Sequence, residues 1–212
     1  MTKSLSVPLV DFETQDLDTA LELHGARFDV DSVNWPAAFP YAPLCSGRIA
    51  RTEDALVVDF RVSGLDLRAQ NLKDNGSQWE DSCVEVFIQD PEGPDYYNFE
   101  INPLGKVLAC CGPDRSHRTP RPAGQMEDIL RIATVEEGPL DYAGGIWTWR
   151  VCLLIPFYLI GVDADTLPHS LRANFYKCGD KTAHPQFVSW NPVEVPAPDF
   201  HRPEFFGELI LA

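Results

Sequence analysis

Acidic and amide side chains recur at alternate positions in two neighbouring stretches of the sequence, and this spacing could gather them into one binding site. Glu85 lies in the first stretch, residues 83–89, and Asn98 and Glu100 lie in the second, residues 96–102. Side chains two residues apart in a strand point to the same face. A large aromatic residue, Trp79, stands just ahead of the first stretch. Carboxylates and amides beside an exposed ring suit a neutral polyhydroxylated ligand, and sugars are the obvious candidates.

The same two stretches carry apolar residues at the intervening positions, which predicts two half-buried strands. One apolar face consists of Val84, Val86 and Ile88, and the other of Tyr97, Phe99 and Ile101. The link from Asp90 to Asp95 is rich in turn-forming residues, so we expect a hairpin. An ordinary antiparallel pair with a solvated outer face is an alternative that the pattern leaves open.

Other short stretches with strand character lie before and after these two at roughly ten-residue spacing, with turn signals between them. They are residues 46–52, 55–63, 106–110, 130–135, 146–155, 171–177, 188–190 and 207–211. Residues 64–78 are expected to form a polar loop, and residues 156–161 a short helical turn. The pattern predicts an all-β fold, an antiparallel β-sandwich of jelly-roll or immunoglobulin-like type, with long loops and little helix. We expect one domain spanning residues 1–212.

Two tryptophans are candidates for stacking against a sugar ring. Trp79 and Trp190 both lie at strand edges among polar neighbours, whereas Trp147 and Trp149 lie on an apolar face and are expected in the core. The weakly polar C–H faces of a sugar pack well on flat aromatic rings. The alternative, that Trp79 and Trp190 only cap the margin of the core, stays open.

Polar residues on the strand at 171–177 could complete such a site. Arg172 and Asn174 oppose the apolar positions of this strand. We expect them to join Glu85, Asn98 and Glu100 in fixing the hydroxyl groups of a ligand. A solvated sheet with a cross-strand Glu85–Arg172 ion pair is the competing interpretation.

Composition restricts the partners. The formal net charge of −15 argues against binding to a phosphate backbone or to an anionic membrane surface. No segment approaches the roughly 20 apolar residues that a membrane helix needs, and residues 1–16 lack the apolar core of a signal peptide. The sequence as written predicts a cytoplasmic protein, or a secreted or periplasmic one if a signal has been removed. The oligomeric state stays open.

The cysteines and histidines do not predict a metal site. Six cysteines occur without a C-x-x-C pair, so free thiols are expected and a zinc site is not. The five histidines form no close pair at the spacing of metal ligands. Loop carboxylates and carbonyls could hold a calcium ion, but no EF-hand pattern exists and no ligands can be assigned.

Several motifs in order along the chain resemble those of carbohydrate-binding module family 9-like domains, within the wider DOMON-like β-sandwich group. They are WEDSCVEVFI, YYNFEINPLG, WRVCLLIPF, LRANFYK, SWNPV and FHRPEFFGELIL, between about residues 35 and 211. The resemblance implies a non-catalytic sandwich in which two tryptophans clamp a terminal sugar. It places Trp79 and Trp190 as the clamp, Glu85 as a hydrogen-bonding glutamate, and Asn98 and Glu100 on a contact strand. A basic residue that the family uses there is not evident. The resemblance also favours a structural calcium ion.

Two alternative functions remain open. A glycan hydrolase would use Glu85 and Glu100 as paired carboxylates, about 5–9.5 Å apart. No nucleophile elbow, phosphate loop or H-E-x-x-H motif supports an enzyme, so none is expected. A DOMON-type haem domain would need a Met/His pair, and Met126 is the one methionine beyond the initiator.

Overall fold

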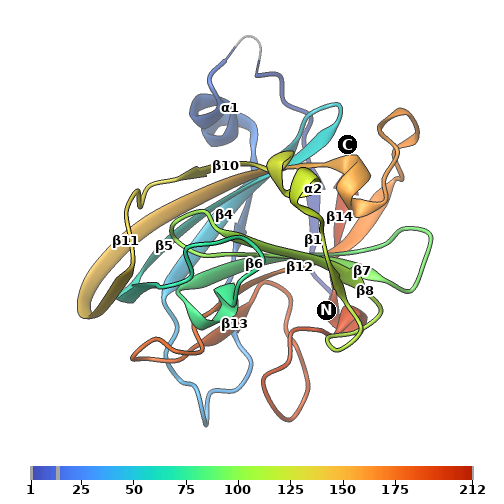
Figure 1. Cartoon of the computed structure of the whole chain (residues 1–212). Coiled ribbons are helices and arrows are strands. Elements are labelled where there is room, and N and C mark those ends of the chain that lie inside the picture. Colours follow the sequence, from blue (N-terminus) through green and yellow to red (C-terminus); the bar gives the residue numbers. More distant parts are fainter. Residues whose placement is uncertain (1, 13–14, 212) are drawn as a thin grey trace.

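Two β-sheets pack face to face in the computed structural model, which describes residues 2–12 and 15–211 (Figure 1). The larger sheet has nine strands in the order β1-β14-β12-β6-β7-β8-β9, and β13 and β3 extend it from β12. The smaller sheet has five strands in the order β10-β11-β5-β4-β2. Nearly all pairings are antiparallel, and β1 runs parallel to β14. The predicted β-sandwich is confirmed.

The strands of the two sheets have the following bounds. The larger sheet contains β1 (Ser4–Val7), β3 (Ser32–Val33), β6 (Cys83–Gln89), β7 (Tyr96–Ile101), β8 (Val107–Gly112), β9 (Thr119–Pro120), β12 (Ser170–Cys178), β13 (Phe187–Ser189) and β14 (Gly207–Leu211). The smaller contains β2 (Ala26–Asp29), β4 (Leu44–Arg51), β5 (Ala55–Ala69), β10 (Leu130–Ala133) and β11 (Leu140–Pro156).

Helical segments are short. The longer ones are α1 (Leu17–His24) and α2 (Ala123–Glu127), and 3₁₀ turns are η1 (Gln78–Glu80), η2 (Phe157–Ile160), η3 (Ala164–Thr166) and η4 (Pro203–Phe205). Asp16 caps α1 by accepting a hydrogen bond from the Thr19 amide, which satisfies a free donor of the first turn. Within the described ranges, no helix has the length and apolar character that crossing a membrane requires.

The inner faces of the sheets form the main core, and the predicted alternation holds there. On β6 and β7 the apolar sets predicted from the sequence all lie in this core. Phe28 from the smaller sheet stacks on Phe175 of β12, with ring centroids 4.2 Å apart. Burying each large apolar side chain contributes about 1.5–3 kcal/mol, so this interface holds the two sheets together.

The outer face of the larger sheet is covered rather than solvated. A second apolar cluster forms there around Phe87, Tyr96 and Tyr176, and side chains from the loop after β3 and from the segment after β13 cover it. Phe200 stacks on Tyr176 at 4.1 Å, and the Trp35 indole donates to the Val195 carbonyl at 2.7 Å. The alternative that β6 and β7 form an antiparallel pair with a solvated outer face is therefore wrong.

Two strands are longer than the sequence pattern indicated. Strand β5 continues to Ala69, into the stretch expected to be loop, because it pairs with a β11 that begins at Leu140. Beside the register shift between Ala143 and Trp147 of β11, Trp147 stacks on Tyr142 at 4.8 Å and is only half-buried, not a full core residue as expected. Trp149 is buried, as predicted.

Trp190 belongs to the inner core. Only 3% of its surface is exposed, its ring centroid lies 5.4 Å from that of Phe175, and its amide donates to the Phe175 carbonyl. A Cβ added at Gly207 would lie 2.4 Å from the Trp190 ring, so a glycine is needed where β14 passes it. The expectation that Trp190 faces Trp79 across an open slot is therefore wrong: the strand's alternation turns this indole inward.

Replacing Trp190 by alanine should lower the free energy of unfolding by about 3–5 kcal/mol, because it leaves a large cavity between the sheets. Urea denaturation would measure the loss. Leu44→Ala, at a side chain that is 79% exposed, is the control and should change stability by less than about 0.5 kcal/mol. Equal small effects in both variants would contradict the core placement of Trp190.

Candidate carbohydrate-binding site

A pocket of about 180 Å³ opens on the outer face of the larger sheet. Trp79, Glu85 and Glu100, which the sequence singled out, all contribute to it. Its other lining residues are Arg115, Arg118, Cys178, Asp180, Phe187, Pro198, Asp199, Phe200 and His201. The pocket therefore combines aromatic walls with a charged floor.

Two carboxylates form the floor. Glu85 on β6 and Glu100 on β7 are direct partners in the antiparallel register, so their side chains lie next to each other on one face. Both are almost fully buried. Arg118 donates from Nη1 to Glu100 Oε1 at 2.7 Å, and Asn98 Nδ2 donates to the same oxygen at 3.0 Å.

The two carboxyl groups are not equivalent. Burial raises the pKa of Glu85 well above its usual range, and the nearby charge of Glu100 raises it further. Burial also raises the pKa of Glu100, but the Arg118 guanidinium opposes that effect by favouring the ionised form. The pair therefore favours a neutral Glu85 beside an anionic Glu100, which leaves Glu85 a proton to donate.

Two acceptor atoms, one at the floor and one beneath it, have no hydrogen-bond partner within the described ranges. They are Glu100 Oε2 and Asn98 Oδ1. A buried polar atom left without a partner costs about 1–3 kcal/mol, and more when it is charged. Glu100 lines the pocket, so a ligand hydroxyl group that donates to its free oxygen would remove that cost there. The floor is thus built to accept hydrogen bonds from something that enters the pocket.

Trp79 lies on the 3₁₀ turn η1, and the buried carboxylate of Asp81 fixes this turn. Asp81 accepts hydrogen bonds from the amides of Gln70 and Asn71 at 2.9 and 3.0 Å, and from Asn102 Nδ2 at 3.0 Å. The Trp79 carbonyl accepts from the Asp180 amide at 3.1 Å. The half-buried indole is therefore held at the pocket by a rigid loop.

Segments that follow β12 in the chain supply further ring side chains of the pocket. Phe187 starts β13, and Phe200 and His201 belong to the segment before β14. Nδ1 of His201 lies 2.7 Å from the Tyr96 hydroxyl. Burial and the charges of Arg118 and Arg115 lower the pKa of His201 to about 3, so this imidazole is neutral at physiological pH.

The remaining predicted residues do not line the pocket. Arg172 is exposed and binds Gln89 and the Pro203 carbonyl, so the Glu85–Arg172 ion pair does not form. Asn174 is buried and holds the C-terminal segment through the amide and carbonyl of Asn191. Asn98 lies beneath the pocket and contacts Glu100. These residues, like Trp190, act in the scaffold around the site.

Sequence reasoning missed the basic residue and the aromatic wall of the pocket. Arg118 comes from the loop after β8 rather than from β7, and no local pattern links it to Glu100. Phe187 could have been found, because the Phe187–Val188–Ser189–Trp190 alternation places Phe187 and Trp190 on opposite faces. Only one of these two rings could reach the outer face.

A β-sandwich whose pocket has aromatic walls and carboxylates at its floor is typical of the class of binding modules. The sequence profile of carbohydrate-binding family 9 matches residues 15–211, and the chain belongs to this family. A search of curated proteins found no match.

Solved structures share the fold. A candidate carbohydrate-binding protein from Bacteroides uniformis is 32% identical, with a TM-score of 0.90 and full coverage of both chains. A family 9 module from Caldicellulosiruptor kristjanssonii in complex with glucose is 13% identical, with a TM-score of 0.56, covering 99% of this chain and 95% of that one. A family 9 module from Caldicellulosiruptor kristjanssonii in complex with cellotriose is also 13% identical, with a TM-score of 0.55, and the match covers 99% of this chain and 93% of that one. At 13% identity the likeness shows the fold alone.

Asp81→Asn should lower the free energy of unfolding by about 2 kcal/mol or more, because the amide presents a donor to groups that already donate. It should also speed amide hydrogen exchange in residues 77–82. Denaturant titration and exchange mass spectrometry would measure these effects. Asp165→Asn, at an exposed carboxylate, is the control. Unchanged exchange in the Asp81 variant would show that this carboxylate does not fix the turn.

At pH values above the ordinary pKa of a glutamate side chain, the Glu85→Gln variant should be more stable than wild type. Because the folded pKa of Glu85 is raised, its contribution to stability is full below the unfolded pKa and is lost as pH rises through the folded pKa. The gap in melting temperature should therefore widen with pH upward from about 4.3, the ordinary glutamate value. Glu194→Gln, at an exposed site, is the control. A gap that does not change with pH for Glu85→Gln would refute the raised pKa.

Proposed function

We propose that this protein binds one neutral sugar ring, either a monosaccharide or the terminal residue of an oligosaccharide, without catalysing a reaction. The observation that carries the proposal is the unpartnered buried acceptor Glu100 Oε2 at the floor of an open pocket with a tryptophan at its side. Membership of carbohydrate-binding family 9 supports the same conclusion.

The chemistry of the pocket suits a sugar. The Trp79 indole offers a flat face to the C–H groups of the ring, and Phe187 and Phe200 add apolar surface. Hydroxyl groups donate to Glu100, whose charge strengthens these hydrogen bonds. A neutral Glu85 donates to a ring or hydroxyl oxygen. Each hydroxyl can therefore meet a partner of the opposite kind.

The size of the pocket favours a single ring. Its volume of about 180 Å³ lies below the roughly 300–1,000 Å³ of pockets that enclose drug-sized ligands. A longer glycan would extend into solvent from a bound terminal residue. The glucose and cellotriose complexes of the Caldicellulosiruptor module make these two sugars the first ligands to test.

The geometry does not favour a glycosidase. Glu85 and Glu100 lie side by side on adjacent strands, at one floor of the pocket, whereas a hydrolase places its two carboxylates on either side of the scissile bond. Glu100 is also held by Arg118 and Asn98. The structure does not favour a haem site either. Met126, the one methionine that could serve as an axial ligand, is buried in the inner core.

Isothermal calorimetry against a panel of mono- and oligosaccharides would test the proposal. Trp79→Ala should weaken binding by about 30-fold or more, corresponding to the loss of about 2 kcal/mol expected at a stacking hot spot. Trp147→Ala, on β11 of the smaller sheet and outside the pocket lining, should bind as wild type does. Absence of heat with every sugar, or full affinity in Trp79→Ala, would refute the proposal. Release of reducing sugar that Glu85→Gln abolishes would favour the hydrolase instead.

A further inference from the structure

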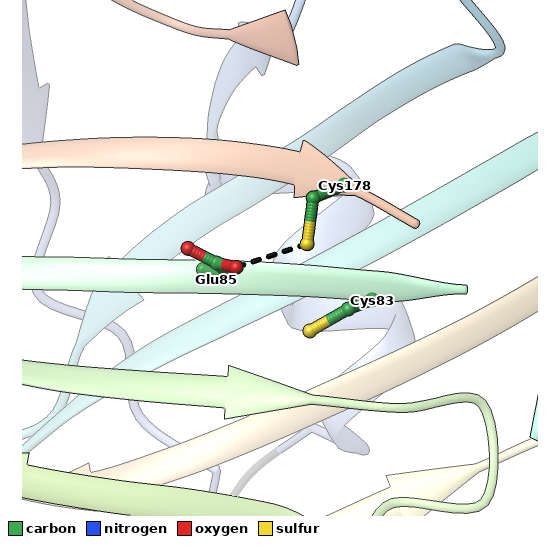
Figure 2. Close-up of side chains that lie close together, drawn as sticks. All are labelled: Cys83, Glu85 and Cys178. Carbon is green, nitrogen blue, oxygen red and sulfur yellow. Dashed lines mark hydrogen bonds between the residues drawn. The ribbon is translucent and has the colours of Figure 1, made fainter. Parts of the chain in front are cut away.

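Three buried side chains of metal-ligating types lie together on β6 and β12 (Figure 2), and two of them, Glu85 and Cys178, also line the pocket. Cys83 begins β6, Cys178 ends β12, and the two are direct partners in the antiparallel register. Glu85 lies two residues after Cys83 and therefore on the same face. The two sulfur atoms and a carboxylate oxygen all lie within 4.8 Å of one another.

We propose that Cys83, Cys178 and Glu85 form a binding site for a divalent ion of the zinc class. Three protein ligands of this kind leave a fourth, open coordination position, and Glu85 and Cys178 both border the pocket. The open position would therefore face the pocket and hold a water molecule or a ligand hydroxyl group. This site goes beyond sugar binding and does not rest on it.

The geometry needs little change to accept the ion. Cys178 Sγ donates to Glu85 Oε1 at 3.0 Å in the metal-free arrangement (Figure 2). Zinc–sulfur and zinc–oxygen distances of about 2.3 and 2.0–2.2 Å imply a ligand-to-ligand separation of about 3.5 Å in a tetrahedral site. The two atoms would move apart by only about half an ångström when the ion replaces the thiol proton. Soft thiolates favour zinc over magnesium or calcium.

The electrostatics of the floor also favour a cation. Arg118 pairs with Glu100, and Glu85 has no ion pair in the described part of the chain. Lys177 reaches the Cys178 carbonyl at 2.6 Å, but it belongs to the opposite face of β12. Burial raises the pKa of Cys83 to about 12, so metal binding must release thiol protons. A bound dication would stabilise the thiolates and the Glu85 carboxylate together.

A disulfide between Cys83 and Cys178 is the competing use of this cross-strand pair. It would leave Glu85 buried with neither its thiol partner nor a cation. A metal ion, unlike a disulfide, would use the Glu85 carboxylate as a ligand together with the two sulfur atoms. Sequence spacing did not reveal the site, because the two cysteines lie on distant strands and form no C-x-x-C motif.

The test is titration of the reduced full-length protein with Co²⁺ in the absence of oxygen and of sugar. Wild type should take up one ion per chain and develop the thiolate-to-cobalt absorption and strong visible bands of a tetrahedral site. Zn²⁺ should displace the cobalt and raise the melting temperature. Because these readouts use wild-type protein and no carbohydrate, failure of metal binding and failure of sugar binding are distinguishable.

Variants assign the ligands. Cys83→Ala and Cys178→Ala should each lose at least tenfold in cobalt affinity and a large part of the sulfur charge-transfer absorption, because one of the two thiolates is gone. Glu85→Gln should weaken affinity while keeping the full absorption per bound ion. Cys152→Ala, at a buried cysteine of the smaller sheet, should behave as wild type. The proposal is overturned if wild type shows no charge-transfer band, if Cys152→Ala removes it, or if mild oxidation by glutathione disulfide joins Cys83 to Cys178 while reduced protein binds no metal.

Discussion

The structure depends on one constraint: two carboxyl groups from adjacent strands lie buried on the same face of a sheet. Glu85 and Glu100 are register partners, and water reaches little of either side chain. Bringing two such groups out of water is unfavourable unless a cation, a shared proton or hydrogen bonds compensate. Arg118 and Asn98 compensate Glu100, while Glu85 relies on a thiol and on its own proton. Incomplete compensation is what makes this floor receptive to a ligand.

The rest of the outer face serves to keep this pair out of water. Tyr176 and Phe200 stack to hold the C-terminal segment against β12, and Trp35 holds the same segment through the Val195 carbonyl. On the other side, Asp81 anchors the turn that presents Trp79. The pocket is therefore a gap left between two rigid covers, and its shape follows from the scaffold more than from the residues at its floor.

The sequence predicted the strands and their inner faces well, because period-two alternation on β6, β7 and β12 is set by local chemistry. It also predicted that Trp79, Glu85 and Glu100 would share a site. It failed for Trp190, where polar neighbours in the chain suggested exposure although strand alternation turns the ring toward Phe175. It could not find Arg118, Phe200 or the Cys83–Cys178 contact, because each depends on segments far apart in the sequence that only the packed fold brings together.

Indole resonances offer the most direct test of the central claim that Trp79, and not Trp190, stands over a functional floor. The chain has five tryptophans, and each gives one indole N–H signal in a ¹⁵N-correlated NMR spectrum. On titration with glucose or cello-oligosaccharides, the Trp79 signal should shift saturably, while the signals of Trp149 and Trp190 stay in place. A spectrum in which Trp79 does not respond to any sugar, or in which Trp190 responds in its place, would contradict the account.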